Sequence, residues 1–298
     1  MLGTLKRLWR SPTFHRATQA VGLNLVPVNF YSNTPSVAEI EDSFEYKGAR
    51  PPYLDSTVFD EDLLRATLEA LIPYGADFIP NLEGDEAVCA NGFFWKNTQF
   101  SWSDAMAYHA LLRAFQPENV VEIGSGFSSL IAQQALQLNG RGKVTCIEPF
   151  PRPFLRDQPN LVLLQAPIQE VSSEELNAVL KDGDFLFIDS THTVKSGSDC
   201  LHIYLRLLPK LERTVYIHVH DIFLPFAMPK EWLLRKRIFW TEQYLLLAWL
   251  LGNPRTKLIY GSAYHGHFSK ELLEQFMRGR YGAGGSSVWI KFEPVPRA

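Results

Sequence analysis

The stretch NVVEIGSGFSS, residues 119–129, decides the fold of this chain. Its first five residues form an apolar run that carries one acid, Glu122, and that stops at a glycine-rich turn. Residues 127–138 then have the composition of a helix. A strand, a glycine turn and a helix in this order begin a βαβ unit. Because ligands of such folds bind beyond the carboxyl ends of the strands, this turn is the first candidate for a binding site.

The alternation of strand-like and helix-like segments continues along the chain. Apolar runs at 143–149, 161–166, 184–190 and 214–223 alternate with helix-length segments at 172–181, 195–211 and 240–252. Runs that are apolar at consecutive positions are typical of parallel strands covered on both faces. Residues 256–263 and 286–294 can pair as closing strands, with the glycines of 280–285 in the turn between them. We predict a doubly wound α/β fold with a mostly parallel, seven-stranded sheet.

The first third of the chain has a different character. Residues 1 to about 60 are irregular and contain several prolines, and helices are expected over 59–75 and in the stretch 101–120, where Pro117 ends the second one. We predict residues 1–90 as an N-terminal wrapping and helical extension and residues 91–298 as a cofactor-binding domain. The aromatic stretch 91–102 is interpreted either as a lid over the site or as a packed linker.

Composition restricts the class of partner. The net charge of −3, with both signs scattered, gives no electrostatic footprint for nucleic acid. The three cysteines are far apart, which favours a reducing compartment, and we predict a cytoplasmic protein. The longest apolar stretch, 244–252, is about half of a bilayer span.

The N-terminus is basic. Four basic residues precede the first acid, Glu39; they are Lys6, Arg7, Arg10 and Arg16. Residues 1–20 are therefore interpreted either as a solvated helix packed on the body or as a helix that docks on a membrane surface or a partner.

The glycine turn distinguishes between nucleotide ligands. Gly124 and Gly126 let the backbone approach a ligand closely, and the helix that follows offers free N–H groups at Phe127, Ser128 and Ser129. A dinucleotide fingerprint has a third glycine where Ser129 stands. Glu122 would repel a pyrophosphate, and the Gly-Lys-Ser/Thr of a P-loop is absent from this stretch.

A ligand with a positive charge explains the acid at the turn. The amino group and the sulfonium of S-adenosylmethionine are such charges, and Glu122 can face them. Glu148 ends the second strand, 22 residues after Gly126, where an acid accepts hydrogen bonds from ribose hydroxyls. Dinucleotide-binding proteins share this spacing. Only Glu122 and the missing glycine therefore favour the sulfonium cofactor.

Several motifs resemble those of a known superfamily. VEIGSGFSS (121–129), CIEP (146–149) and FIDSTHT (187–193) resemble motifs of the class I S-adenosylmethionine-dependent methyltransferases. The longer pieces FIDSTHTVKSGSD, HVHDIFLPF and WTEQYLLLAWL are similar to a bacterial branch without assigned substrates. The resemblance runs from about residue 90 to residue 292. It implies a seven-stranded sheet, methyl transfer and S-adenosylhomocysteine as product, and it leaves the acceptor open.

A second group of polar residues follows the fourth and fifth expected strands. Asp189 and His192 follow one strand, and His220 and Asp221 end the next, so we expect these side chains to converge at the mouth of the cofactor site. The group resembles a two-His-one-carboxylate site, which leaves a divalent metal or iron open, with Asp189, His220 and Asp221 as ligands. The catechol O-methyltransferase-like enzymes place metal-binding acids and amides at these strand ends; Asp189 matches, but a His-Asp pair stands where they have an acid and an amide. His218 is expected to be a buried, hydrogen-bonded strand residue.

These observations lead to one main hypothesis. The chain is expected to be a methyltransferase that acts on a small molecule, at an oxygen atom, with Asp189, His192 and His220 as catalytic residues. The expected cofactor ligands are Glu122, Gly124, Gly126, Phe127, Ser128, Ser129, Glu148 and Asp189. Two alternatives stay open: a nicotinamide-dependent oxidoreductase on the same fold, and a non-catalytic cofactor-binding partner protein.

Overall fold

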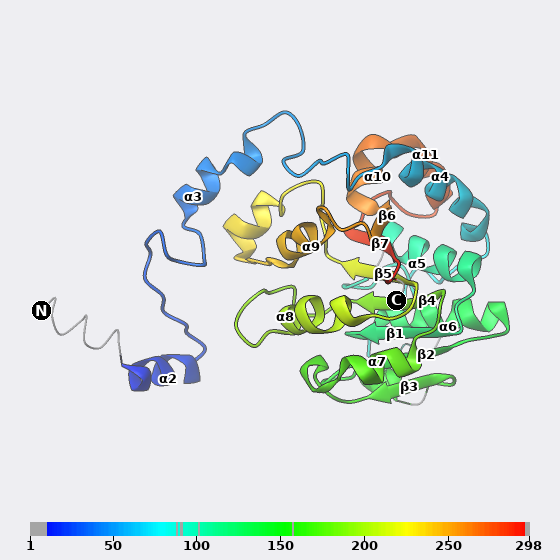
Figure 1. The fold of residues 1–298 in the computed structure, drawn as a ribbon, viewed down its shortest axis with the longest axis horizontal. Helices are drawn as coiled ribbons and strands as arrows, with labels where there is room; N and C mark the ends of the chain where they lie inside the picture. The colour runs from blue at the N-terminus through cyan, green and yellow to red at the C-terminus, as the bar shows by residue number, and fades with distance from the viewer. Residues whose placement is uncertain (1–10, 88, 90–91, 101, 157, 296–298) are drawn as a thin grey trace, which may run out of the picture.

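The computed structural model describes residues 11–87, 89, 92–100, 102–156 and 158–295. Its centre is a seven-stranded sheet with the strand order β3-β2-β1-β4-β5-β7-β6 (Figure 1). Strands β1 to β5 are parallel to one another, and β7 pairs antiparallel with both β5 and β6. The strands are β1 Asn119–Ile123, β2 Lys143–Ile147, β3 Leu161–Leu164, β4 Asp184–Ile188, β5 Val215–His220, β6 Thr256–Gly261 and β7 Ser287–Phe292.

Helices connect the strands and cover both faces of the sheet. The α-helices are α2 Pro12–Ala20, α3 Val37–Asp42, α4 Glu61–Leu71, α5 Trp102–Phe115, α6 Phe127–Asn139, α7 Ser173–Val179, α8 Asp199–His202, α9 Glu242–Leu250, α10 Ser262–Phe268 and α11 Lys270–Met277. Short 3₁₀ segments are η1 Phe44–Tyr46, η2 Ile72–Gly75, η3 Pro153–Leu155, η4 Ile168–Glu170 and η6 Leu208–Lys210. Two segments are π-helical, η5 Ile203–Leu207 and η7 Trp232–Lys236.

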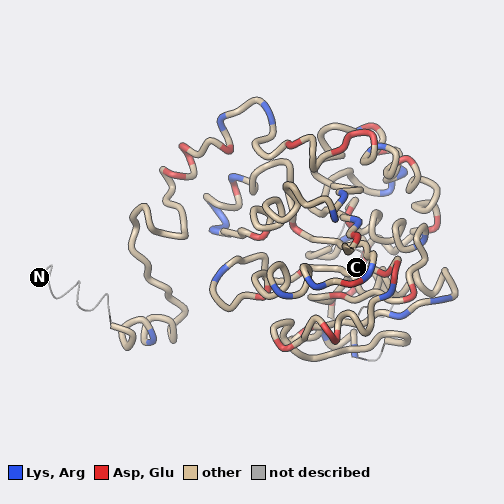
Figure 2. Tube along the Cα trace, in the orientation of Figure 1, with Lys and Arg blue, Asp and Glu red and all other residues tan. Residues whose placement is uncertain are grey.

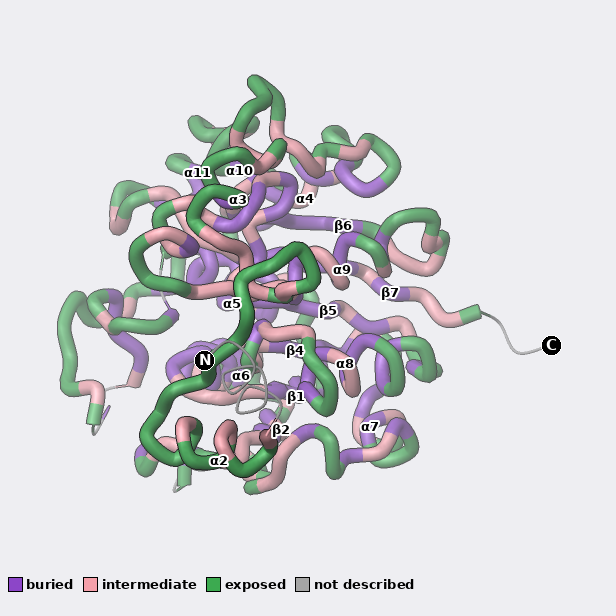
Figure 3. The backbone as a smooth tube through the Cα atoms, turned by 90° about the vertical axis from the view of Figure 1, so that its left-hand side faces the viewer, coloured by how far each residue is buried: buried purple, intermediate pink, exposed green. Residues whose placement is uncertain are grey.

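The sheet divides the core into two layers, because the side chains of each strand point alternately to its two faces. Figure 3 shows the strands with helices on either side. In β1, Val120 packs with the layer that contains α5, α6 and α11, whereas Val121 and Ile123 pack with the layer that contains α7, α8 and α9. Successive side chains of a strand point to opposite faces, so Glu122 shares the side of Val120. In β5, His218 and His220 take that same side by the same rule. This alternation decides which strand-end groups can meet a ligand.

The predicted sheet is confirmed in strand number, direction and closing pair. The helix expected over 195–211 begins at Asp199 and continues through η5 and η6 to Lys210. Between β6 and β7 the sequence prediction placed only a glycine turn, which was wrong, because α10 and α11 lie there. Leu273, Phe276 and Met277 are the buried residues of α11, and their helical spacing was the signal that the prediction overlooked.

The N-terminal extension has two parts. From residue 58 onward it packs into the body: Leu64 and Leu68 of α4 belong to the two main core layers. Upstream of α3 it stands away from the body, and Figure 1 shows α2 and the segment after it on the side toward which the strand arrows point. The aromatic stretch 91–102 forms a packed linker over its described part, since Phe93, Phe94, Trp95 and Phe100 are all buried.

Candidate functional site

The carboxyl ends of β1, β2, β4 and β5 meet at one edge of the sheet. Ile123 of β1 is in register with Ile147 of β2 and with Ile188 of β4. The N–H of Gly124 donates to the carbonyl of Ile147 at 3.0 Å, and the N–H of Asp189 donates to the carbonyl of Ile123 at 2.9 Å. The first residues beyond these strands are therefore neighbours.

A cavity of about 380 Å³ opens at this edge. It is lined by the glycine turn at Gly124, by Glu148 and Phe150 after β2, and by Asp189 and Thr191 after β4. This volume lies within the range of sites for small molecules and cofactors. Glu148 accepts hydrogen bonds from the backbone N–H groups of Phe150 at 2.7 Å and Ser125 at 3.3 Å, which fixes its carboxylate at the mouth. Three of the predicted cofactor residues, Gly124, Glu148 and Asp189, thus share one cavity.

The glycine turn is shaped by contact with the loop after β4. Gly124 has φ of 80°, and a Cβ placed on it would lie 1.7 Å from the carbonyl oxygen of Asp189. No larger residue fits there. A Cβ on Gly126 would meet nothing within 4 Å, so the backbone of that residue is open to an incoming group.

Glu122 does not line the cavity. Its carboxyl group is fully buried between β1, α5 and α6, where the Tyr108 hydroxyl donates to Oε1 at 2.9 Å and the Ser129 hydroxyl donates to Oε2. Phe127 and Ser128, also predicted as cofactor ligands, are buried with Ser129 in the first turn of α6. Burial raises the pKa of Glu122 to about 7, although hydrogen bonds from Ser129 and Tyr108 oppose the shift. Its predicted contact with a cofactor cation is therefore not direct in this geometry.

The raised pKa of Glu122 predicts a pH-dependent stability. The folded chain keeps the proton between the ordinary pKa of 4.5 and about 7, where the unfolded chain has lost it. The free energy of unfolding should therefore fall as pH rises through this window, by roughly 3 kcal/mol for this group. In Glu122→Gln that contribution is absent. Urea unfolding at several pH values should give a flatter curve for Glu122→Gln than for the wild type, while the exposed control Glu271→Gln follows the wild type. Parallel curves for Glu122→Gln and the wild type would show that Glu122 does not hold the proton.

Two histidines and two aspartates converge beside the cavity. Asp189 Oδ1 lies 3.2 Å from Nε2 of His192 and 3.4 Å from Nδ1 of His220. Asp221 Oδ2 lies 3.7 Å from each of the same two nitrogens. Asp189 therefore belongs both to the cavity wall and to this cluster. The predicted convergence of the strand-4 and strand-5 residues is present in the structure.

Each histidine has a further carboxylate behind it. Nδ1 of His192 lies 2.8 Å from Oε2 of Glu242, and the Tyr204 hydroxyl donates to the other oxygen of that carboxylate at 3.0 Å. Nε2 of His220 lies 3.7 Å from Oδ2 of Asp104. These outer partners orient both rings. The sequence analysis missed Glu242, although an acid in the otherwise apolar stretch 242–250 is an unusual feature of a buried helix.

The charges of the cluster shift its pKa values. Burial alone would lower the pKa of His192, but Asp189 and Glu242 outweigh it and raise the pKa to about 10. Burial also opposes protonation of His220, and the charges of Asp189 and Asp221 nevertheless raise its pKa well above the usual value. The pKa of Asp189 is lowered, because the two histidines outweigh the effect of burial. Burial raises the pKa of Asp221. The carboxylates around both rings therefore favour their doubly protonated, positively charged forms.

The surroundings of the cluster are aromatic and conformationally constrained. His192 and Asp221 have positive φ values of 57° and 52°, a backbone conformation that is uncommon for these residues and often found at functional sites. The Phe100 ring lies 4.8 Å from that of His220, and the Trp240 ring lies 4.5 Å from that of His192. Trp240 is thus the aromatic residue of the 240–252 segment that adjoins the cluster.

His218 is a core residue, as predicted, but without the predicted hydrogen bond. Its ring stacks on Phe187 at 4.1 Å, and neither of its nitrogens has a partner among the described residues. Burial lowers its pKa well below the usual value. It therefore stays neutral and serves packing.

The geometry does not support the metal ion that the sequence left open. No group of three or more His, Cys, Asp or Glu side chains in the described part of the chain is arranged to hold a metal. Asp189 and Asp221 instead lie at ion-pair distances from the rings of His192 and His220. The predicted metal ligands Asp189, His220 and Asp221 thus lie together, but as members of an ion-pair cluster, and the metal itself has no support from the geometry of the described residues.

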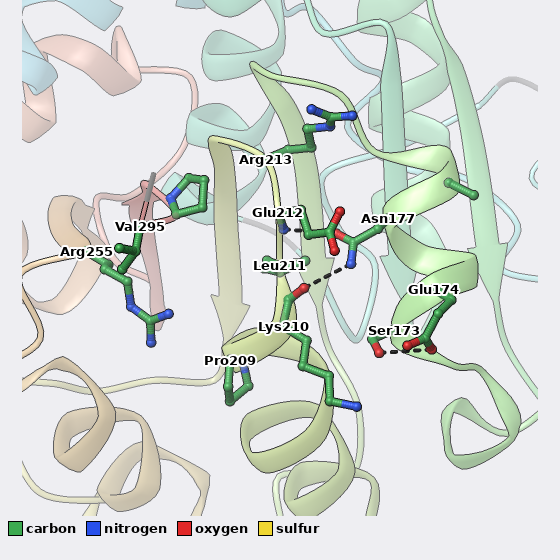
Figure 4. Close-up of a pocket in the computed structure, with 12 residues that line it drawn as sticks. Ser173, Glu174, Asn177, Pro209, Lys210, Leu211, Glu212, Arg213, Arg255 and Val295 are labelled. Carbon is green, nitrogen blue, oxygen red and sulfur yellow. Dashed lines mark hydrogen bonds between the residues drawn. The ribbon is translucent and has the colours of Figure 1, made fainter. Parts of the chain in front are cut away.

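A larger hollow of the described surface lies elsewhere. It has a volume of about 950 Å³ and is lined by Asn177, Lys210, Arg213 and Arg255, as Figure 4 shows. These residues precede strands or belong to α7, at the amino ends of β5 and β6. Ligands of doubly wound sheets bind at the opposite edge, so size alone does not identify the site.

The chain was compared with protein families, with curated proteins and with solved structures. Residues 121–222 match a family model described as a methyltransferase domain. An uncharacterized protein from Archaeoglobus fulgidus is 32% identical over 165 residues, which cover 51% of this chain and 72% of that protein. The O-methyltransferase from Bacillus cereus in complex with SAH is 12% identical, with a TM-score of 0.41, over 76% of this chain and 91% of that chain. An O-methyltransferase of tomaymycin synthesis from Streptomyces achromogenes, in complex with SAM, is 12% identical, with a TM-score of 0.39, over 77% of this chain and 90% of that chain. None of the helices among the described residues has the length and hydropathy of a membrane span.

Proposed function

We propose that this chain, which belongs to the class I S-adenosylmethionine-dependent methyltransferase superfamily, methylates an oxygen atom of a small-molecule acceptor. The observation that supports this most is that Asp189 belongs to two places at once. It lines the cavity together with Glu148, and it contacts the rings of His192 and His220. A donor that occupies the cavity and an acceptor that lies against the histidines would meet at this carboxylate.

The donor would use the cavity as follows. Glu148 would accept hydrogen bonds from the ribose hydroxyls, and the adenine ring would lie beside Phe150, which is 87% exposed at the rim. Open backbone at Gly126 would receive the methionine end, and Asp189 would face the sulfonium. Family membership and Ser129 in place of a third glycine both weigh against the nicotinamide alternative.

The proton of the acceptor needs a base. The charges of Asp189 and Asp221 favour the protonated form of His220, and a sulfonium bound near Asp189 would lower the pKa of the ring. Nδ1 of His220 lies 3.4 Å from Asp189 Oδ1 and 3.7 Å from Asp221 Oδ2, so after losing its proton it could receive the hydroxyl proton and pass it toward these carboxylates. The oxygen then attacks the methyl carbon, the carbon–sulfur bond breaks, and S-adenosylhomocysteine leaves. Holding both reactants in line would supply about 7–11 kcal/mol of the barrier reduction.

The acceptor atom can be tested with labelled donor. Aromatic compounds that carry a hydroxyl, an amine or a carboxylate on the same ring are offered to the full chain with methyl-labelled S-adenosylmethionine. Label should enter the hydroxyl compound, and the rate should rise with pH as the base loses its proton. Transfer to the amine but not to the hydroxyl would overturn oxygen as the acceptor atom, without touching the assignment as a methyltransferase.

A further inference from the structure

An exposed apolar segment stands in front of the strand ends. Residues 11–35, here called the arm, lie upstream of α3, and Figure 3 shows most of the arm as an exposed tube. No charged residue occurs between residues 21 and 31. Within that range the large apolar residues are all exposed: Val21, Leu23, Leu25, Val26, Val28, Phe30 and Tyr31.

Exposure of this extent is unusual for a surface in water. The side chains of Val28, Phe30 and Tyr31 are 82%, 81% and 83% exposed, and α2 buries no residue. The rings of Phe30 and Tyr31 lie 4.0 Å apart, so they present one aromatic surface. A contiguous apolar surface of this kind marks a site that another surface covers.

Positive charge accompanies the arm on the same side of the molecule. η7 and the residue after it carry Arg235, Lys236 and Arg237, all exposed. Figure 2 shows basic positions on the part of the body that faces the arm. Lys236 lies over the ring of Trp232, and Arg237 lies over the ring of Phe239. We call residues 230–237 the basic segment. A cluster of basic and aromatic side chains is suited to the headgroup region of a bilayer.

The sequence upstream of α3 has charge of the same sign. Residues 1–38 contain four basic residues and no acid, and Arg16 is the one that lies among the described residues. The acids of α3 follow directly and keep their charge, although Asp42 pairs with Lys47. In the basic segment Arg235 pairs with Glu231 at 3.4 Å, and Lys230, Lys236 and Arg237 add to it. The basic segment therefore carries a net positive charge that attracts anions, whereas the whole chain has a net charge of −3.

We propose that the arm and the basic segment together dock on the surface of an anionic lipid bilayer. Val28, Phe30 and Tyr31 enter the interface, and Arg235, Lys236 and Arg237 contact the anionic headgroups. A second copy of this chain is a poorer occupant, because it would bring the same positive charges to the same face. Docking in this way turns the carboxyl edge of the sheet, with the cavity and the histidine cluster, toward the bilayer.

Vesicle flotation tests the proposal on the full chain. The chain should float with vesicles of phosphatidylcholine and phosphatidylglycerol and should not float with phosphatidylcholine alone. Replacing Arg235, Lys236 and Arg237 together by Gln should weaken binding roughly 100-fold. The double variant Phe30→Ser and Tyr31→Ser should weaken it at least about tenfold.

Matched controls separate docking from general surface effects. Ile79→Ser with Leu205→Ser removes two apolar side chains that are 71% and 60% exposed elsewhere, and it should leave flotation unchanged. Binding of S-adenosylhomocysteine should stay the same in every variant, which shows that the fold is intact. Failure of the wild type to float with anionic vesicles overturns the proposal. So does a dimer in vesicle-free solution that the Phe30 and Tyr31 variant dissociates, since the arm would then bind a second copy.

Discussion

Replacement of Asp189 by Asn should lower kcat by roughly 100- to 10,000-fold. The carboxylate contacts Nε2 of His192 at 3.2 Å and Nδ1 of His220 at 3.4 Å, and it forms part of the donor cavity. An amide keeps the shape of the side chain but removes the charge that raises both histidine pKa values. Kinetics with saturating donor and acceptor would measure the loss.

The loss has to be distinguished from a structural defect. Asp77 is a matched control, because its Oδ1 lies 2.8 Å from Nε2 of the buried His109, a histidine that does not belong to the cluster. Asp77→Asn should retain kcat. Because Asp189 and His220 act as one unit, a double variant Asp189→Asn with His220→Gln should be little worse than either single variant. Additive losses would contradict a shared role for the two residues.

Replacement of Glu148 by Ala should weaken the binding of S-adenosylhomocysteine by about 1.5–3 kcal/mol, or roughly 10- to 150-fold in Kd. Glu148 lines the cavity, and its carboxylate is held there by the N–H groups of Ser125 and Phe150. The ribose hydroxyls of the ligand would lose a charged acceptor. Calorimetric titration measures the change directly.

Two further titrations complete this comparison. Glu271→Ala removes an exposed acid from the first turn of α11 and should bind S-adenosylhomocysteine as tightly as the wild type does. Glu148→Gln keeps the hydrogen-bonding shape and should lose less affinity than Glu148→Ala. Equal affinity of Glu148→Ala and the wild type would place the ribose away from this carboxylate.

The sheet could be predicted from the sequence because its strands are buried on both faces. The mostly apolar runs at 119–123, 184–188 and 215–219 leave little choice other than parallel strands between helices. Residues 262–277 were missed because the glycines downstream of them were interpreted as a direct turn between two strands. The helical spacing of the buried residues in α11 shows that the correct pattern was present.

The site could be predicted in part. The sequence indicated which residues follow the strands, but not the direction in which each side chain points. Acids and histidines at strand ends indicated Asp189, His192, His220 and Glu148, which the structure brings to one edge. The sequence placed Glu122 at the same edge, but alternation along β1 turns its carboxyl toward Tyr108 and Ser129. The pairing of Glu242 with His192 and of Asp104 with His220 joins distant segments, so it depends on tertiary packing that no local pattern contains.

A crystal structure of the full chain with bound S-adenosylhomocysteine tests the account most directly. The ligand should lie in the cavity at the carboxyl edge, with its ribose hydroxyls on Glu148 and its sulfur atom on the side of Asp189 and the two histidines. A ligand bound at another surface, or one whose sulfur points away from Asp189, would contradict the claim that this carboxylate joins the donor site to the acceptor site.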